Sequence, residues 1–162
     1  MGYSVFPAPA ASGKTMYRTT LLSGTSWTVP AGVTYINVTL IGAGGGGSGY
    51  GNNDYAAGFN GLGGQIVHST LATTPGASIS YSIGAGGSGG PSSSPFNASS
   101  GGSTTMTGAT TAAGGAGASR NYGTTGGSGQ AGMTANNGGQ GVTWTSSGGS
   151  GGNGAIVIEY WV

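Results

Sequence analysis

Four stretches of the chain alternate apolar and polar residues with the two-residue period of a β-strand that buries one face. They are residues 33–41, 64–72, 77–84 and 155–162. The residues expected on the apolar faces of the first three are Ile36, Val38, Leu40, Val67, Leu71, Ile79, Tyr81 and Ile83. Pro30-Ala31-Gly32 and Thr74-Pro75-Gly76 are turn signals beside these stretches. Because no long stretch shows helical periodicity, the pattern predicts an all-β chain with no α-helix.

Glycine tracts separate these stretches, and several of them place glycine at every third residue. The repeats are Gly84, Gly87 and Gly90; Gly123, Gly126, Gly129 and Gly132; and Gly148, Gly151 and Gly154. Three residues is the repeat of a polyproline-II type helix, which has no internal hydrogen bonds. Such helices satisfy their amides by packing side by side when one face is bare glycine and the backbones approach closely. The pattern therefore predicts a small β-sandwich-like sheet combined with packed polyglycine-II segments.

The alternative is that the tracts are flexible linkers of glycine and serine. Each glycine costs roughly 0.5–1 kcal/mol of backbone entropy relative to alanine, or about 20–40 kcal/mol over 40 glycines. That cost exceeds the ~5–15 kcal/mol net stability of a typical domain. Either dense backbone pairing compensates for it or the tracts stay disordered. The short intervals between strands and tracts favour pairing.

The chain has 162 residues, the size of one domain, and carries very few charges. Three basic and two acidic residues give a net charge of +1. Nucleic-acid binding requires clustered Lys and Arg, and these basic residues form no cluster, so we expect no nucleic-acid partner. No apolar run approaches the ~20 residues of a membrane span, so we expect no membrane insertion. We divide the chain into an N-terminal arm, residues 1–25, and a glycine-rich β domain, residues 26–162.

Two glycine-containing motifs resemble nucleotide-binding loops in part of their pattern. Gly42, Gly44 and Gly47 satisfy the G-x-G-x-x-G pattern after a strand-like run, but the residues that follow are poor helix formers. A dinucleotide site also needs an acidic residue about 20 positions on, and Asp54 comes too early. The stretch "APAASGKT" ends like a phosphate-binding loop, yet no strand precedes it. Glycine at 42–47 is therefore expected to allow close backbone packing.

The chain has few of the side chains that enzymes commonly use for catalysis. The chain has one His, one Asp and one Glu, which leaves almost no choice of an acid–base pair. His68 lies on an expected strand, where a structural or exposed histidine is the simpler interpretation, and Glu159 alternates like a solvent-facing strand residue. There is no Cys, which excludes disulfides and Cys-bound metals. We therefore expect no enzyme activity, no catalytic residue, no metal site and no cofactor.

The segments that interrupt the glycine tracts concentrate the large polar and aromatic side chains. The candidate binding residues are Tyr50, Asn52, Asn53, Asp54, Tyr55, Phe59, Phe96, Asn97, Arg120, Asn121 and Tyr122. Loops of this composition form adaptable recognition surfaces, because aromatic rings supply contact area and amides supply hydrogen bonds. Aromatic rings beside amides also suit sugars. In the alternative interpretation, the aromatics cap the ends of the glycine layers as a small core.

Three stretches resemble the glycine-rich domains of bacteriophage tail fibres. They are "SWTVPAGVTYINVTLIGAGGGGSG", "LATTPGASISYSIGAGGSGG" and "GGSGGNGAIVIEYWV", and the resemblance covers roughly residues 26–162. The tracts also resemble those of T-even-like adhesins, in which packed polyglycine-II helices display variable loops that bind outer-membrane proteins. This chain departs from those adhesins in having more β-strand and no long attachment domain.

The resemblance implies a structural protein of the virion, outside the cell, located in a tail fibre or tail tip. It implies that the candidate binding residues contact a bacterial surface glycan or outer-membrane protein, and that residues 1–25 attach to other virion proteins. Such domains commonly end a trimeric fibre, which implies a homotrimer. The alternative is a capsid or tail decoration protein with a purely structural role. Ice binding is a third interpretation, disfavoured by the broken glycine period and the lack of disulfides.

Overall fold

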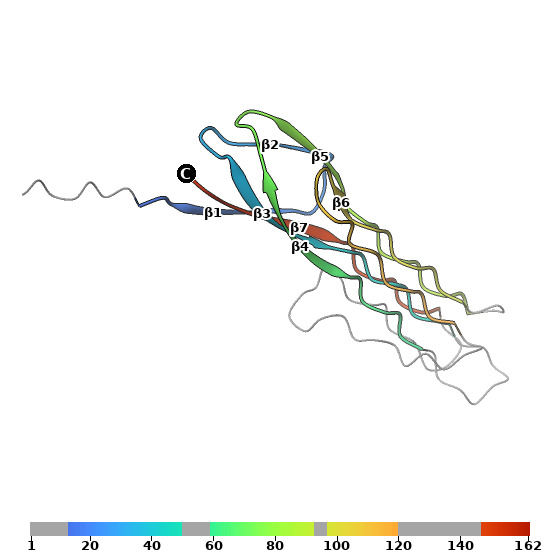
Figure 1. Cartoon of the computed structure of the whole chain (residues 1–162). Helices are drawn as coiled ribbons and strands as arrows, with labels where there is room; N and C mark the ends of the chain where they lie inside the picture. The colour runs from blue at the N-terminus through green and yellow to red at the C-terminus, as the bar shows by residue number, and fades with distance from the viewer. Residues whose placement is uncertain (1–12, 50–58, 93–96, 120–146) are drawn as a thin grey trace, which may run out of the picture.

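The computed structural model describes residues 13–49, 59–92, 97–119 and 147–162 (Figure 1). These residues form two antiparallel sheets and contain no helix, so no helix among them is long and apolar enough to cross a membrane. The strands are β1 (Met16–Leu21), β2 (Ser26–Thr28), β3 (Tyr35–Ile41), β4 (Ile66–Ala72), β5 (Ser78–Ser82), β6 (Thr105–Met106) and β7 (Ala155–Trp161). One sheet has four strands in the order β1-β7-β3-β4, and the other has three in the order β2-β5-β6. The all-β prediction is confirmed.

The four alternating stretches all contain strands, which are β3, β4, β5 and β7. Strands β1, β2 and β6 were not predicted, because none of them has a clear alternating pattern long enough to detect. β1 lies inside the range that the sequence assigns to the N-terminal arm. It pairs along its whole length with β7, with Met16 opposite Trp161 and Leu21 opposite Ile156. Pairing with a distant segment, rather than local pattern, makes residues 16–21 a strand.

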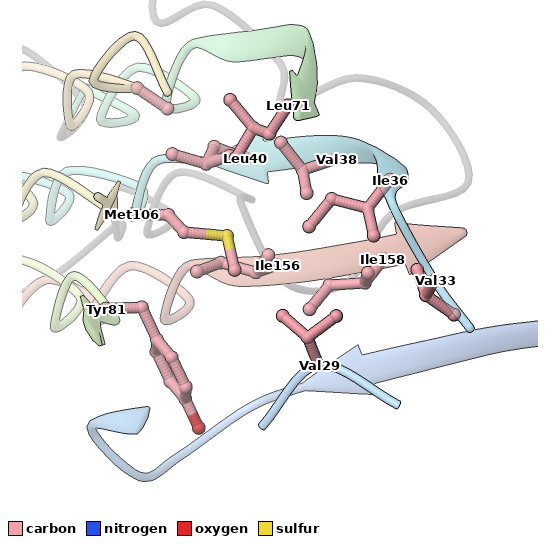
Figure 2. Close-up of a cluster of buried hydrophobic side chains, with 11 residues drawn as sticks. Val29, Val33, Ile36, Val38, Leu40, Leu71, Tyr81, Met106, Ile156 and Ile158 are labelled. Atoms are coloured by element: carbon pink, nitrogen blue, oxygen red, sulfur yellow. The ribbon is translucent and has the colours of Figure 1, made fainter. Parts of the chain in front are cut away.

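The hydrophobic core lies between the two sheets (Figure 2). Strands β3 and β7 supply the central side chains Ile36, Val38, Leu40, Ile156 and Ile158, each at most 1% exposed. The facing side chains are Val29, Tyr81 and Met106. Each large aliphatic side chain buried in this way stabilises the fold by roughly 1.5–3 kcal/mol. The apolar positions of the alternating pattern are therefore the ones whose side chains pack into this core.

Both predicted turns are tight turns closed by glycine. Val33 donates its amide hydrogen to Pro30, and Ala77 donates to Thr74, so each turn has the hydrogen bond of a β-turn. Gly32 and Gly76 both have φ of 79°. A positive φ at this position is characteristic of a type II turn and is adopted at little cost only by glycine.

Six glycine-rich tracts extend from one end of the sheets as a bundle of long coils that lie side by side (Figure 1). We call this the glycine bundle. Its tracts are residues 42–49, 59–65, 84–92, 97–103, 112–119 and 147–154. Residues 42–49, the central tract, are buried throughout, while the other tracts each expose some positions. Residues 42–49, 84–92 and 112–119 lead away from the sheets, and the other three tracts return to them.

The hydrogen bonds of the central tract repeat every three residues. Gly42, Gly45 and Ser48 donate to tract 59–65, Ala43 and Gly46 donate to tract 97–103, and Gly44 and Gly47 donate to tract 147–154. The three returning tracts thus accept from successive amides, as the threefold screw of a polyglycine-II helix requires. The carbonyls of Ala43, Gly44, Gly46 and Gly47 accept from tracts 84–92 and 112–119. The amides that a phosphate would need at residues 42–47 therefore already have carbonyl partners.

Two of the predicted glycine rows pair directly with each other. Gly148, Gly151 and Gly154 donate their amide hydrogens to the carbonyls of Gly90, Gly87 and Gly84, at 2.8 Å in each case. The row Gly84, Gly87 and Gly90 is buried, and the residues between its members are partly or fully exposed. The prediction of packed polyglycine-II segments is confirmed for these two rows. The row Gly123 to Gly132 lies outside the described residues.

Candidate functional site

The glycine bundle brings the ends of its six tracts, at residues 49, 59, 92, 97, 119 and 147, together at its end remote from the sheets. Each outgoing tract pairs with a returning tract, so the segments 50–58, 93–96 and 120–146 all begin and end away from the sheets. We call this end of the bundle the tip. The far end of the four-stranded sheet holds the start of β1 and the end of β7, where Thr15 and Val162 exchange two backbone hydrogen bonds.

Hydrogen bonds show that the tracts end at the same level. The last turn of the central tract, residues 46–48, bonds to all five of the other tracts. The partners there are Phe59, Gly90, Ser99, Ala118 and Gly149. Every connecting segment therefore leaves and rejoins the bundle within about one turn of the same level, which is roughly 9 Å at 3.1 Å per residue. Segments that are far apart in the sequence are attached side by side at the tip.

Two of the candidate binding residues lie among the described residues, and both are at the tip. Phe59 is half-buried and is held to the central tract by two hydrogen bonds: its amide donates to the Ser48 Oγ at 2.7 Å, and its carbonyl accepts from the Ser48 amide at 2.8 Å. Asn97 is exposed at the start of a returning tract. The remaining candidates lie outside the described residues: Tyr50, Asn52, Asn53, Asp54, Tyr55, Phe96, Arg120, Asn121 and Tyr122.

A second polar surface lies on the four-stranded sheet, on the side away from the core. The strand register aligns Arg18 of β1, Glu159 of β7, Asn37 of β3 and Thr70 of β4 in one row across all four strands. His68 of β4 stands opposite Thr39 of β3 in the next row. We call this surface the outer face. As the sequence indicated, Glu159 is on the solvent side of its strand and His68 is exposed.

Hydrogen bonds and one ion pair link the side chains of the outer face across the strands. The Thr70 Oγ1 donates to the Asn37 Oδ1 at 2.8 Å, and the Thr39 Oγ1 lies 2.9 Å from the His68 Nδ1. The Arg18 Nε is 3.7 Å from a Glu159 oxygen, in a pair that is largely exposed. Exposed pairs of this kind contribute about 0–1 kcal/mol. The polar groups are thus ordered by their neighbours without being buried.

Comparison with known proteins supports the glycine-rich character of the chain. The model of a family described as a glycine-rich domain matches residues 19–155. This match covers well over half of the chain. The chain belongs to the glycine-rich domain family. No curated protein gave a match.

In this glycine-rich domain the family match extends from β1 to the first residue of β7 and includes the whole bundle. On the outer face it covers Asn37, Thr39, His68 and Thr70, and it leaves out Arg18 and Glu159. Sequence reasoning selected its candidates from the concentration of tyrosine and asparagine between the tracts, and of these the structure describes Phe59 and Asn97, at the tip. It missed the outer face, although the strand alternation already places Asn37 and Thr39 on one side of a strand. What the pattern lacks is the strand order, which puts Arg18 and Glu159 beside Asn37.

Proposed function

We propose that this glycine-rich domain is a virion protein of a bacteriophage, a tail-fibre or tail-tip adhesin that binds the host cell surface. The segments that connect the tracts supply the binding residues, and residues 1–25 attach the domain to other virion proteins. The receptor is a bacterial surface glycan or an outer-membrane protein. The domain acts outside the cell, without catalysis, nucleic-acid binding or membrane insertion, and assembles as a homotrimer.

The observation that carries this proposal is the common level at which the connecting segments join the bundle. A receptor-binding surface needs several variable segments held together on a rigid support. The central tract provides that support, because its last turn is hydrogen-bonded to every other tract of the described bundle. The sequence supports the same conclusion, since the segments between the tracts contain Tyr50, Tyr55 and Tyr122 and five asparagines.

The bundle also suits a protein exposed to a varying external medium. Its described tracts are held by backbone hydrogen bonds, and the only ion pair among the described residues is on the sheet. Ion pairs at a surface weaken as salt rises, whereas buried backbone bonds do not depend on screening. The assignment to a phage particle rests on the resemblance of three sequence stretches to tail-fibre domains.

Adsorption of the purified full chain to a panel of bacterial strains tests the proposal. A variant carrying Tyr50→Ala, Asn52→Ala and Tyr55→Ala is compared with wild type after circular dichroism has shown that both are folded. A control with Ser78→Ala and Ser80→Ala alters exposed residues of the three-stranded sheet, remote from the tip. We expect wild type and control to bind some strains, and the tip variant to lose binding at least about tenfold.

The other outcomes separate the alternatives. Equal binding by wild type and the tip variant retains an adhesin and moves its site to another connecting segment. Absence of binding to every strain contradicts the adhesin and favours the decoration protein, which imaging of the assembled particle would then test.

A further inference from the structure

The outer face of the four-stranded sheet gathers most of the charge that this chain has. The full sequence contains three basic and two acidic residues and one histidine. Three of these charged residues, Lys14, Arg18 and Glu159, lie at this face together with His68. In a chain with 3% charged residues, this makes the outer face the most charged surface among the described residues, and the place to look for a polar ligand site.

The face has a shallow polar depression of about 360 Å³, within the size range of small-ligand sites. Asn37, Thr39, His68, Thr70 and Glu159 line it. A larger groove of about 590 Å³ runs beside β4 and β5, but its lining residues include no charged or aromatic side chain. The smaller depression is therefore the better candidate for specific recognition of a polar ligand.

The internal hydrogen bonds of the face leave complementary groups available to such a ligand. Asn37 accepts from Thr70 through its Oδ1, and among the described residues its Nδ2 amide hydrogens have no partner. Glu159 contacts Arg18 through one oxygen at 3.7 Å, a weak exposed pair that a ligand can displace. Asn37 and Glu159 are direct partners across β3 and β7, so their Cβ atoms are about 4.5–5.5 Å apart.

A donor amide beside an acceptor carboxylate matches the chemistry of neighbouring sugar hydroxyls. Each hydroxyl both donates and accepts a hydrogen bond, so one can donate to the Glu159 carboxylate while its neighbour accepts from the Asn37 amide. Hydrogen bonds that involve an ionised group are stronger than neutral ones. Paired recognition of this kind favours a polyhydroxylated ligand over a simple anion or an apolar molecule.

Two exposed aromatic side chains adjoin these polar groups. Tyr35 precedes Asn37 by two residues and Trp161 follows Glu159 by two, so all four share the outer face at a spacing of about 6.6–6.8 Å along each strand. Tyr35 is 64% exposed and Trp161 is 38% exposed. With Lys14 they line an adjoining depression of about 220 Å³. Aromatic rings with a polar tip are suited to surfaces where a ligand has both apolar and polar faces, as a sugar ring does.

We propose that the outer face of the four-stranded sheet binds a saccharide. Asn37 and Glu159 bind its hydroxyls in the depression of about 360 Å³. Tyr35 and Trp161 stack on a sugar ring in the depression of about 220 Å³. Two adjoining depressions accommodate two or more linked sugar units. This site is at the opposite end of the domain from the tip, and it does not depend on the proposed adhesin role.

A label-free binding screen of the full chain against an immobilised panel of neutral and acidic oligosaccharides tests this proposal. The saccharide that binds best is then titrated in solution against wild type, Asn37→Ala, Glu159→Gln and Tyr35→Ser, each checked for folding by circular dichroism. We expect each variant to weaken binding about tenfold or more, since a hydrogen bond to a charged group or a stacked ring is worth that factor. The control with Ser78→Ala and Ser80→Ala is expected to bind like wild type.

Several results would overturn the proposal. One is that no saccharide of the panel binds, and another is that Asn37→Ala and Glu159→Gln bind as well as wild type. Loss of saccharide binding only in the tip variant with Tyr50→Ala, Asn52→Ala and Tyr55→Ala would also overturn it, while supporting the adhesin. Light scattering that shows self-association abolished by Tyr35→Ser would assign the face to contacts between copies of the chain instead.

Discussion

At the scale of single residues, one threonine connects the sheets to the glycine bundle. Thr104 is fully buried, its Oγ1 donates to the carbonyl of Ile41 at 2.7 Å, and the same oxygen accepts from the amide of Gly84 at 3.1 Å. Ile41 ends β3 and Gly84 begins a tract, so both backbone groups are at the point where strand pairing gives way to bundle pairing. A buried backbone group without a partner costs free energy comparable to a lost hydrogen bond. The Thr104 hydroxyl therefore satisfies two groups that neither element can satisfy.

Replacing Thr104 with valine keeps its shape and removes both hydrogen bonds. We expect Thr104→Val to lower the free energy of unfolding by about 1–3 kcal/mol, because the buried Gly84 amide and Ile41 carbonyl lose their partner. Thr104→Ser keeps the hydroxyl and is expected to cost only about 0.8 kcal/mol, the value of one buried methyl group. Urea denaturation measures both variants. A Thr104→Val variant that loses no more stability than Thr104→Ser would show that the two hydrogen bonds of the hydroxyl contribute little at this position.

At the scale of the element, a peripheral tract such as residues 84–92 repeats one buried, one exposed and one partly buried position per turn. In residues 84–92 the row Gly84, Gly87 and Gly90 is buried, whereas Ala85 and Ser88 are exposed. A Cβ added at Gly87 would collide with the carbonyl oxygen of Ser99 and with the amide nitrogen of Gly46. The backbones approach so closely because only hydrogen atoms lie between them. Glycine is required at these rows for steric reasons and not for an unusual φ.

We expect Gly87→Ala to destabilise the protein by about 1–3 kcal/mol or more, since the neighbouring backbones must separate to admit the methyl group. The adjacent exposed substitution Ser88→Ala is a matched control and is expected to change stability by less than about 0.5 kcal/mol. Thermal unfolding followed by circular dichroism compares the two. A Gly87→Ala variant as stable as Ser88→Ala would contradict the packed arrangement of tract 84–92.

At the scale of the whole molecule, the bundle is organised around a single buried tract. Residues 42–49 have no exposed member, and their amides and carbonyls bond to five surrounding tracts. Every described tract outside the centre thus depends on residues 42–49 for some of its hydrogen bonds. The centre of the bundle is expected to open only when the central tract loses its partners, so opening of the centre and global unfolding are one event, whereas the peripheral tracts can open locally near the tip.

Hydrogen exchange measured by NMR tests this organisation. The amides of Gly44, Gly45 and Gly46 are expected to exchange only through global unfolding, because they are buried and bonded within the bundle. Amides that join peripheral tracts near the tip, such as those of Ala98 and Gly148, are expected to exchange faster. Exchange of the central amides as fast as that of the peripheral amides, and faster than global unfolding, would show that the central tract opens without unfolding of the protein.

The sequence alone determined the class of fold and the main packing rule of the bundle. Alternation of apolar and polar residues predicts β3, β4, β5 and β7, because a strand that buries one face must repeat every two residues. The rows beginning at Gly84 and at Gly148 predict close backbone packing, because only glycine permits it. The clustering of Tyr and Asn between tracts points to the segments that are attached at the tip.

Only the tertiary structure decided which segments pair and what they bring together. Strand β1 has no pattern of its own and exists because β7 supplies its hydrogen bonds. The central position of residues 42–49 follows from contacts with five tracts, none of which is distinguished by glycine content alone. The row from Arg18 through Glu159 and Asn37 joins three strands separated by long stretches of chain. Local sequence fixes the face on which a side chain lies, whereas its neighbours across the sheet depend on strand order and register, which arise from the packing of the whole chain.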